Sequence, residues 1–460
     1  MMTVQEAAHA LHAEWWGENA LFTGVSTDSR TIQPGDLFVA LSGAHYDGHQ
    51  FIASARAKGA VAALVEKQAG IGSSLAGLGC IQVCDTRLGL GQLSAYWRTR
   101  FSLPLVAVTG SNGKTTVKEM IAAIFREAVK ANTEQSNSAA DSVLATAGNL
   151  NNDIGVPQML LRLREQHAYA VIEMGMNHTS EIAYLTRLAK PTIAVITNAG
   201  AAHIEGLGSV EAVARAKGEI FESLSNTGVA IINADDEYAA LWRELAGNRR
   251  IIEFGLSGSA QVTAYCRTDA SADEWTLKLP AGSEEMRLQI PGQHNIRNAL
   301  AAAAAAVAAG IDKRTIAAGL QAFAGVPGRM QKKAGLHQAS LIDDTYNANP
   351  DSMRAALAVL AHAPGKKVLV LGDMGELGPG AADFHYQIGV EASHAGVEQL
   401  LTLGNLSKHT AAGFGSGARH FTSMDALLVE AEKLLDANVT MLVKGSRFMQ
   451  MERVIKQLEV

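Results

Sequence analysis

Short apolar runs alternate with longer amphipathic segments from the beginning of the chain. Up to residue 103 the apolar runs predict strands and the amphipathic segments predict helices. The predicted strands are 35–41, 59–65 and 81–83, and the predicted helices are 51–58 and 88–100. Strands separated by helices are typical of an α/β unit. Pro104 follows the last of these helices, so we place the end of a first domain at residue 103.

The same alternation continues on a larger scale between residues 104 and 325. The predicted strands are 105–109, 168–172, 192–197, 229–232 and 251–254, and the predicted helices are 115–128, 180–188, 210–224 and 295–309. Such apolar strands are buried on both faces, which indicates a mostly parallel sheet. Polar and apolar residues alternate between 261 and 290, so we expect antiparallel strands at an edge of that sheet.

A second boundary follows residue 325, where a Gly-Val-Pro-Gly sequence ends the helical pattern. Beyond it the predicted strands are 340–342, 368–371, 400–403 and 440–443, and the predicted helices are 352–361, 381–392, 424–435 and 449–458. This order is Rossmann-like, but no Gly-x-Gly-x-x-Gly follows its first strand, so we assign this domain no nucleotide of its own. The predicted chain therefore has three α/β domains: 1–103, 104–325 and 326–460.

One turn of the central domain carries a phosphate-binding motif between a β-branched strand and a helix. Its residues are Gly110, Ser111, Asn112, Gly113, Lys114, Thr115 and Thr116. The glycines let backbone N–H groups surround phosphate oxygens, and the helix N-terminus favours an anion. Lys114 would then contact the β- and γ-phosphates, and Thr115 would bind Mg²⁺. The alternative, a surface turn, is disfavoured because both flanks fit the motif. The loop indicates a nucleoside triphosphate but not the reaction.

Polar side chains follow two strands that should run parallel to the strand before this loop. Glu173 ends one strand, and Asn198 and His203 follow the next. Ligands of open α/β sheets bind at the carboxyl ends of strands, so Glu173 and His203 are candidate Mg²⁺ or Mn²⁺ ligands beside Thr115. Taken singly, an exposed carboxylate and a loop histidine are the favoured interpretations. The convergence of both residues at one edge of the sheet makes the metal site an equally good interpretation. Lys217 lies on the predicted helix 210–224, and a solvated side chain is its default interpretation, because lysine is rarely buried.

The third domain offers candidates at its joint and at two strand ends. Arg329 lies at the domain boundary, where a guanidinium can reach a γ-phosphate. Asp344 and Asn347 lie between a strand and a helix. One interpretation is that one of them caps this helix, and the other is that one of them forms a hydrogen bond to a ribose or to a substrate amine. Lys444 and Arg447 follow the last strand and suit a carboxylate. In the first domain, the polar clusters 26–30 and 42–49 are by themselves more typical of turns than of sites.

Composition narrows the functional classes. The chain has 460 residues with 48% hydrophobic and 18% charged, which excludes disorder, and its net charge of −6 gives no support for nucleic-acid binding. Cys80 and Cys84 form a possible metal pair without a second pair, so with Cys266 we expect reduced thiols. The N-terminus lacks the order of a signal peptide, and the longest apolar run, 299–309, is too short to span a bilayer. We therefore expect a soluble cytoplasmic protein.

Ten short motifs, which include the phosphate-binding loop and the strand ends described above, follow one another along nearly the whole chain. They are 109–116, 149–157, 173–175, 202–206, 216–221, 292–295, 327–329, 344–350, 372–378 and 443–447. In this combination the sequence resembles the ATP-dependent Mur ligases. The stretches 346–350 and 372–378 resemble those members that add D-alanyl-D-alanine to UDP-N-acetylmuramoyl-tripeptide. Segment 134–141 departs from the family pattern, because it is longer than in relatives.

The resemblance implies a three-domain amide ligase. Residues 1–103 would bind the UDP end of the muramoyl tripeptide, 104–325 would bind ATP and Mg²⁺, and 326–460 would bind D-alanyl-D-alanine. An acyl phosphate would form first and react with the amine next. The reaction would be the last cytoplasmic step in making the peptidoglycan precursor UDP-N-acetylmuramoyl-pentapeptide, and the enzyme would be a monomer with no nucleic-acid or membrane partner.

The resemblance also implies roles for individual residues. Lys114, Lys217, His203, Arg329 and Asp344 would be catalytic. The nucleotide would be bound by residues 110–116, with Asn295 at the adenine, Arg329 at the γ-phosphate and Asp344 at the ribose. The metal ligands would be Thr115, Glu173, His203 and Lys217, the last as a carbamate. The substrate-binding residues would be Ser29, Arg30, Ser42, His45, Asp47, His49, Asn149, Asn151, Asn152, Tyr346, Asn347, Asn349, Lys444, Ser446 and Arg447.

Three alternatives stay open at the level of sequence. Another ligase of the superfamily, such as a folylpolyglutamate synthase, would lack the first domain of residues 1–103. A regulatory protein switched by ATP would hydrolyse it without either ligase substrate. A small-molecule kinase would give a phosphorylated product in place of an amide.

Overall fold

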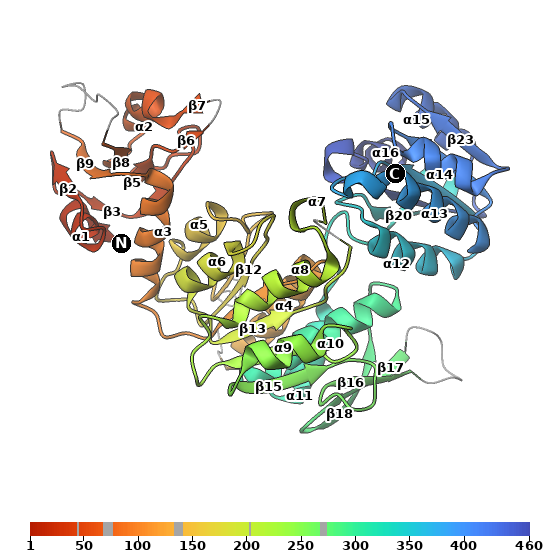
Figure 1. The fold of residues 1–460 in the computed structure, drawn as a ribbon, viewed down its shortest axis with the longest axis horizontal. Coiled ribbons are helices and arrows are strands. Elements are labelled where there is room, and N and C mark those ends of the chain that lie inside the picture. The colour runs from red at the N-terminus through yellow and green to blue at the C-terminus, as the bar shows by residue number, and fades with distance from the viewer. Residues whose placement is uncertain (44–45, 68–76, 133–140, 202–203, 267–273) are drawn as a thin grey trace.

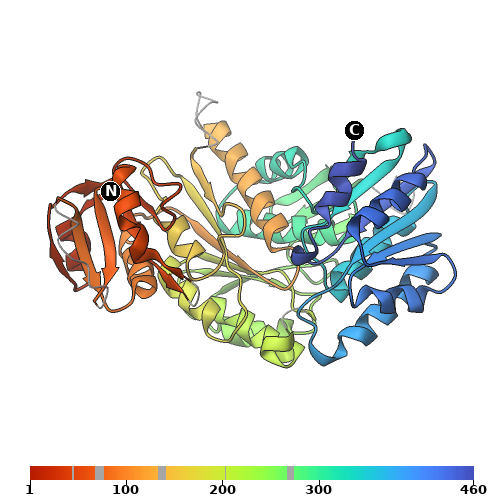
Figure 2. The same cartoon turned by 90° about the horizontal axis from the view of Figure 1, so that it is seen from above.

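The computed structural model describes residues 1–43, 46–67, 77–132, 141–201, 204–266 and 274–460. His45, His203 and most of segment 134–141 lie outside these residues. The strands form their main sheets in three successive parts of the chain (Figure 1). Figure 2 shows these parts in a row, with the N-terminal and C-terminal domains at opposite ends. None of the described helices is both long and apolar enough to cross a membrane.

The N-terminal domain is built on a five-stranded sheet. In spatial order its strands are β2 (Glu14–Trp16), β9 (Gly79–Val83), β8 (Ala62–Glu66), β5 (Asp36–Val39) and β4 (Gly24–Ser26). Its helices are α1 (Val4–Ala10), α2 (Ile52–Ala57) and α3 (Thr86–Arg98), and short pairs join β1 (Met2–Thr3) to β3 (Leu21–Phe22) and β6 (Ser42–Gly43) to β7 (Tyr46–Asp47). The three predicted strands are present. Strands β2 and β4 escaped prediction because they are short and lack a buried apolar run.

The central domain contains a six-stranded sheet in which every pairing is parallel. In spatial order its strands are β11 (Val143–Ala145), β12 (Tyr169–Glu173), β10 (Leu105–Thr109), β13 (Ile193–Ile196), β14 (Val229–Asn233) and β15 (Arg250–Phe254). Alternate strand residues face opposite layers, which explains the continuous apolar runs in the sequence. Val106 and Val108 pack with one group of helices, and Leu105 and Ala107 pack with the other.

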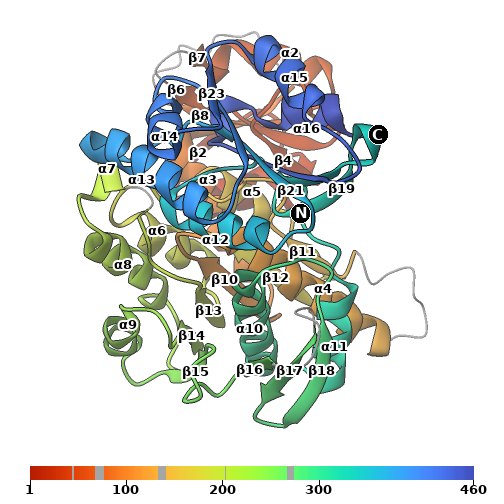
Figure 3. The ribbon, with the colours of Figure 1, turned by 90° about the vertical axis from the view of Figure 1, so that its right-hand side faces the viewer.

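Helices cover both faces of this sheet, as Figure 3 shows. One layer consists of α4 (Lys114–Asn132), α10 (Gln293–Ala308) and α11 (Lys313–Ala322). The other consists of α5 (Gly155–Leu160), α6 (Glu181–Ala189), α8 (Val210–Gly218) and α9 (Ala239–Ala246), with the one-turn helices α7 (Ile204–Leu207) and η4 (Glu219–Phe221) nearby. The run of alanines in α10 lets this helix lie close to the sheet and to α4, because small side chains allow close approach.

The antiparallel strands predicted between 261 and 290 are present, but their predicted place at the edge of the parallel sheet is wrong. Strands β16 (Thr263–Cys266), β17 (Glu274–Leu279) and β18 (Gly282–Arg287) form a sheet of their own. The apolar face of β17, with Trp275 and Leu277, packs into the same core as α10 and α11. This burial holds the small sheet on the helix layer, and one isolated bridge from Phe254 to Val262 links it to β15.

The C-terminal domain has the predicted Rossmann-like alternation. In spatial order its strands are β19 (Gln331–Ala334), β20 (Ser340–Asp344), β24 (Val439–Lys444), β21 (Lys366–Gly372), β22 (Gln399–Leu403) and β23 (Ala418–Phe421). Only β19 is antiparallel among these described strands. The helices are α12 (Pro350–Ala361), α13 (Ala381–His394), α14 (Ser407–Phe414), α15 (Met424–Lys433) and α16 (Glu452–Leu458). Together the three domains confirm the predicted α/β fold class.

Candidate functional site

A polar cavity of about 790 Å³ lies where the central and C-terminal domains face each other. The central domain contributes the loop after β10 and the carboxyl ends of β12 and β13. The C-terminal domain contributes the ends of β20 and β24 and the start of α12. The carboxyl ends of strands from both sheets therefore face the same cavity, and ligands of open α/β sheets bind at these ends.

The phosphate-binding motif adopts a backbone that needs its two glycines. Gly110 has φ +151° and Gly113 has φ +83°. A Cβ at Gly110 would lie 1.8 Å from Thr197 Oγ1, and a Cβ at Gly113 would lie 2.4 Å from Asn298 Oδ1. The loop therefore stays open enough for its N–H groups to surround an anion ahead of α4.

Lys114 and the end of β13 hold this loop in shape. Lys114 Nζ donates to the carbonyls of Gly110 at 2.6 Å and Ser111 at 3.3 Å. Asn112 N donates to Asn198 Oδ1 at 2.9 Å, and Thr197 Oγ1 donates to Asn112 O at 2.6 Å. Burial lowers the pKa of Lys114, and the negative charge of Glu173 opposes this effect. The result is a fixed cradle with one ammonium group at its centre.

Thr115 and Glu173, predicted as metal ligands, are in direct contact. Thr115 Oγ1 donates to Glu173 Oε2 at 2.8 Å, and Asn151 Nδ2 donates to the other carboxylate oxygen at 2.8 Å. Glu173 is only 3% exposed, so the interpretation as an exposed carboxylate is wrong. Glu173 N donates to Thr146 Oγ1 at 2.8 Å, which fixes the end of β12. An oxygen-rich pair thus lies directly beside the phosphate loop.

Lys217 is buried on α8 and is only 1% exposed, so its interpretation as a solvated helix lysine is wrong. Burial, followed by the nearby charge of Lys114, lowers the pKa of Lys217 well below its ordinary value. A neutral amine is consequently favoured here, and a neutral amine is the reactive form of lysine.

Arg329 reaches across the domain joint. Its Nη2 donates to Thr115 Oγ1 at 2.9 Å, and its guanidinium lies 4.1 Å from the centre of the Tyr346 ring. The Nε atom of Arg329 is buried and has no hydrogen-bond partner in the part of the chain that the structure describes. Arg447 lies on the same aromatic ring, 5.8 Å from its centre. Tyr346 therefore orients two guanidinium groups in the cavity.

Asp344 and Lys444 pair with each other. Lys444 Nζ donates to Asp344 Oδ2 at 2.5 Å and to Asn347 O at 2.8 Å, and Met330 N donates to Asp344 Oδ1 at 3.2 Å. Burial raises the pKa of Asp344, while Lys444 acts in the opposite direction. Asp344 and Lys444 lie opposite each other on the paired strands β20 and β24, which explains the contact.

The N-cap of α12 is Asn349, so the interpretation of Asp344 or Asn347 as the cap is wrong. Asn349 Oδ1 accepts from Ser352 N at 2.9 Å, and Ser352 Oγ in turn accepts from Asn349 N at 3.0 Å. The Nδ2 of the same Asn349 donates to Asn112 Oδ1 at 2.9 Å. The cap of a C-terminal helix thereby contacts the phosphate loop of the central domain.

Asn295 lines the cavity from the first turn of α10 and is 3% exposed. Its Nδ2 donates to Pro291 O at 2.7 Å, and its Oδ1 accepts from Asn298 Nδ2 at 3.1 Å. Burial lowers the pKa of the neighbouring His294 to about 4, so that imidazole is neutral at pH 7.

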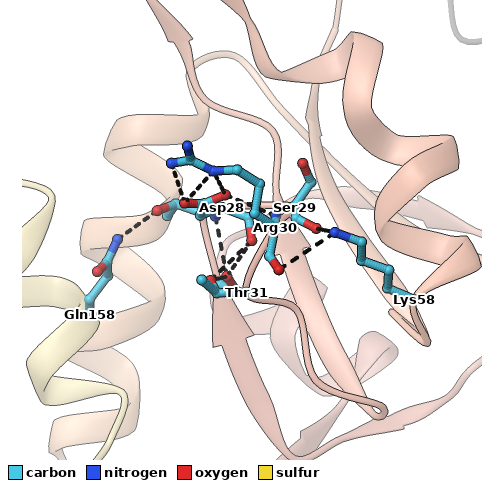
Figure 4. A network of polar contacts seen from close by, with 8 residues as sticks. Asp28, Ser29, Arg30, Thr31, Lys58 and Gln158 are labelled. Carbon is cyan, nitrogen blue, oxygen red and sulfur yellow. Dashed lines mark hydrogen bonds and ion pairs between the residues drawn. The ribbon is translucent and has the colours of Figure 1, made fainter.

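The candidates of the N-terminal domain form turns apart from this cavity. Figure 4 shows Asp28 paired with Arg30 and Lys58 reaching the same turn, where Lys58 Nζ donates to Ser29 O at 2.9 Å. Ser42 Oγ donates to Asp47 at 3.4 Å. His49 accepts from Glu66 N at 2.9 Å through Nε2, so its Nδ1–H donates to Asp47 at 2.6 Å. The expectation of a turn holds for residues 27–30, whereas Ser42 and Asp47 lie on the paired strands β6 and β7.

Several cavity residues were not predicted from the sequence. They include Arg87, Asn298, Asp351 and Glu376. Asp351 Oδ2 accepts from Ala201 N at 3.1 Å and so adds a further contact between domains. Of these, only Glu376 carried a signal, since it belongs to the motif 372–378. The predicted residues Asn149, Asn151, Asn152, Tyr346, Asn347, Asn349, Lys444 and Arg447 line the cavity. Ser446 lies behind it and accepts from Gly375 N at 2.8 Å.

Known proteins resemble this chain over its full length. Family models match residues 21–95 (Mur ligase family, catalytic domain), 108–306 (Mur ligase middle domain) and 328–447 (Mur ligase, glutamate ligase domain). A UDP-N-acetylmuramoyl-tripeptide–D-alanyl-D-alanine ligase from Escherichia coli K12 is 42% identical, and the alignment covers 100% of this chain and 98% of the relative.

Solved structures give the same result. MurF from Acinetobacter baumannii superposes with a TM-score of 0.89 at 36% identity, and the match covers 99% of this chain and 98% of the other. MurF ligase from Thermotoga maritima, solved in complex with ADP, superposes with a TM-score of 0.82 at 25% identity, covering 96% and 98%.

Proposed function

The chain belongs to the Mur ligase family, and we propose that it joins D-alanyl-D-alanine to UDP-N-acetylmuramoyl-tripeptide in an ATP-dependent reaction. The product is the pentapeptide precursor of peptidoglycan. The observation that carries this proposal is the contact of Arg329 with Thr115, which brings a cation of the C-terminal domain to the phosphate loop of the central domain. A site assembled from two domains suits a reaction that must bring separate substrates together.

The residues around the loop fit ATP and Mg²⁺, which the reaction uses. Gly110 and Gly113 leave room that any Cβ would fill, and the buried Nε of Arg329 lacks a hydrogen-bond partner among the described residues. The hydroxyl of Thr115 and the carboxylate of Glu173 provide hard oxygen ligands of the kind that Mg²⁺ prefers. When bound, Mg²⁺ supplies positive charge that neutralises phosphate oxygens.

We propose two further ligands for this metal. His203 lies outside the described residues and is assigned by its place after β13. Lys217 would act as a carbamate: its neutral amine attacks CO₂, an N–C bond forms, and a proton leaves to solvent. Its burial and its lowered pKa favour this reaction. A carbamate would supply an anionic oxygen, whereas an ammonium group would repel a cation.

In the proposed first step, the terminal carboxylate of the tripeptide attacks the γ-phosphorus of ATP. A P–O bond forms, the bond to the bridging oxygen breaks, and ADP leaves. An anion approaches a polyanion here, so Lys114 and Arg329 lower the barrier by neutralising charge. In the second step the ammonium group of D-alanyl-D-alanine loses a proton to solvent, and the resulting amine attacks the acyl carbon. A C–N bond forms, the C–O bond to phosphate breaks, phosphate leaves, and the nitrogen loses its second proton to solvent. The facing domains exclude water, which would otherwise hydrolyse the acyl phosphate.

The remaining assignments follow the domains, with the proposed boundaries 1–103, 104–325 and 326–460. Ser29, Arg30, Ser42, His45, Asp47 and His49 would bind the UDP end of the tripeptide in the first domain. Asn295 would contact the adenine, and Arg447 in the third domain would bind the carboxylate of D-alanyl-D-alanine. Asp344 would meet the ribose through an oxygen not taken by Lys444. We also propose that the enzyme acts as a monomer in the cytoplasm, where ATP and the UDP-linked precursor occur.

The test is the mass of the product formed from a synthetic UDP-N-acetylmuramoyl-tripeptide, ATP and D-alanyl-D-alanine. We expect an amide whose mass equals the summed masses of the UDP-N-acetylmuramoyl-tripeptide and D-alanyl-D-alanine less one water. It should form only when both of these substrates and ATP are present. Phosphate release without D-alanyl-D-alanine at the same rate would instead indicate an ATP-switched protein. A phosphorylated tripeptide as the stable end product would indicate a kinase. Either result would refute the proposal.

A further inference from the structure

The motif 372–378 lies between β21 and α13, and hydrogen bonds and apolar contacts anchor it in the C-terminal domain on both sides of Glu376. Asp373 is 6% exposed, and its carboxylate accepts from the backbone N–H groups of Asn405 at 2.8 Å, Leu406 at 3.1 Å and Ser407 at 2.7 Å. These groups lie at the start of α14, where a negative charge is favoured. The first half of the motif is thereby fixed to a neighbouring helix.

Two more backbone contacts fix the residues that follow. Met374 N donates to His385 Nε2 at 2.9 Å, and His385 Nδ1–H donates to Ala381 O at 2.7 Å. Gly375 N donates to Ser446 Oγ at 2.8 Å. On the other side, Leu377 is 4% exposed in the apolar core. The turn therefore has no freedom to move its middle residue by a large distance.

Glu376 is that middle residue, and its geometry is unusual. It has φ +60°, a left-handed conformation that costs free energy for a residue with a Cβ. Its neighbours point inward, while Glu376 lines the cavity shared with the phosphate loop. Its negative charge acts on Lys114 across that cavity, where it opposes the effect of burial on the pKa of Lys114. The rigid turn thus presents one carboxylate to the reaction space.

The second feature is the place of this turn beside Arg447. A Cβ at Gly375 would lie 2.9 Å from Phe448 Cε1, so the turn packs against the residue that follows Arg447. Arg447 also lines the cavity and retains 63% exposure of its side chain. An anion and a cation are therefore held on neighbouring segments of one wall. D-alanyl-D-alanine is a zwitterion, with an ammonium group at one end and a carboxylate at the other.

We propose that Glu376 binds the ammonium group of D-alanyl-D-alanine and thereby orients this amine toward the acyl phosphate. The inference rests on the proposed function, and it gives the acceptor site a polarity: the amine lies at Glu376, and the carboxylate lies at Arg447. A charged hydrogen bond of this kind contributes about 1.5–3 kcal/mol, which corresponds to roughly 10- to 100-fold in affinity.

The test compares Glu376→Gln with the wild-type enzyme in steady-state kinetics. We expect the KM for D-alanyl-D-alanine to rise roughly 10- to 100-fold, while the KM values for ATP and for the tripeptide stay within about threefold. Glu432→Gln is the matched control, because Glu432 is an exposed glutamate on α15 of the same domain and does not line the cavity. It should leave all three KM values unchanged.

An inhibitor that lacks the ammonium group separates binding from loop structure. N-propionyl-D-alanine keeps the carboxylate and the methyl groups, so Glu376→Gln should weaken its inhibition by less than about twofold. Equal weakening of the dipeptide and this analogue would show that Glu376 only maintains the turn, and unchanged KM values would overturn the proposal as well. If the wild-type enzyme forms no amide from D-alanyl-D-alanine, the proposed function itself fails, and this is seen before any variant is compared.

Discussion

The central domain meets its two neighbours in different ways. Its joint with the N-terminal domain is part of one continuous apolar core, in which Trp97 of α3 packs with Leu163 and Leu188. Trp97 Nε1 donates to Leu163 O at 3.1 Å. The joint with the C-terminal domain is polar. There the two apolar cores of residues 330–458 include no described residue of the central domain.

The polar joint consists of a few hydrogen bonds around the cavity. Arg329 donates to Thr115, Asn349 donates to Asn112, and Asp351 accepts from Ala201 N. A dry apolar interface is costly to open, whereas hydrogen bonds of this kind exchange readily for bonds to water or substrate. We infer that the first joint holds the N-terminal domain in place and that the second joint opens and closes during turnover.

The largest expected effect is on turnover, at the polar joint. We predict that Arg329→Ala lowers kcat by about 10³-fold or more, because the variant removes the cation that neutralises the γ-phosphate. The thermal midpoint should change by less than about 2 °C, since the residue belongs to neither apolar core. Amide formation and thermal unfolding of the same sample measure the two effects.

Arg329→Lys is the control for charge alone. It keeps one positive charge but loses the planar fork and the contact with the Tyr346 ring, so it should recover only part of the lost rate. A wild-type rate in Arg329→Ala would show that the contact with Thr115 is incidental, and the comparison of the two joints would lose its functional meaning.

This polar joint also shows how far a sequence alone can predict a site. The strand-end rule placed Glu173 near Thr115, and the two side chains are in contact. The same rule could not predict that Asp344 pairs with Lys444, because it gives the ends of strands but not which strands are neighbours. The adjacency of β20 and β24 spans a hundred residues and depends on packing of the whole domain.

The second effect tests the apolar joint through stability. Trp97 is 6% exposed, and we predict that Trp97→Ala lowers the free energy of unfolding by about 3–5 kcal/mol through the cavity left behind. Thermal or urea unfolding measures this change. Trp16→Ala is the matched control: Trp16 lies on the edge strand β2 with 40% exposure, so its loss should cost much less. Equal costs for both variants would contradict a core shared by two domains.

The third effect concerns the buried lysine beside the phosphate loop. In buffer free of CO₂ we predict that Lys217→Met raises the free energy of unfolding by roughly 1–3 kcal/mol at pH 7, because methionine carries no polar group to desolvate. The folded pKa of Lys217 is lowered, so the unfolded state binds the extra proton. Wild-type stability therefore falls as pH drops below about 10.4, and the advantage of methionine shrinks as pH rises toward that value.

Unfolding curves across pH for the two proteins measure this difference, with the exposed Lys456→Met as control. Addition of ¹³C-labelled bicarbonate should give a carbamate signal in the wild-type spectrum that is absent from Lys217→Met. A variant that is less stable than the wild type at every pH would show that the amine makes stabilising contacts.

Burial of Lys217 is the clearest case in which residue type misleads. Lysine is mostly exposed, but the helical period of α8 places position 217 on the same face as the buried Val213 and Ala214. The side chain becomes buried because the helix lies against the sheet next to the phosphate loop, where the ammonium of Lys114 also resides. The family resemblance pointed away from a solvated lysine, and so does the position of Lys217 on the apolar face of the helix.

The smallest expected effect is on the stability contributed by an ion pair at the apolar joint. Arg87 of α3 forms an ion pair with Asp153 of the central domain, and an Nη2 to Oδ1 distance of 2.8 Å accompanies it. Their side chains are 55% and 30% exposed, so water screens the pair. A double-mutant cycle of Arg87→Gln and Asp153→Asn should give a coupling of only about 0.2–1 kcal/mol, which disappears in roughly 1 M salt. A coupling of several kcal/mol that persists in salt would mean that charge, rather than apolar burial, holds the first joint. Both joints would then depend on polar contacts, and they would differ only in the number of these contacts.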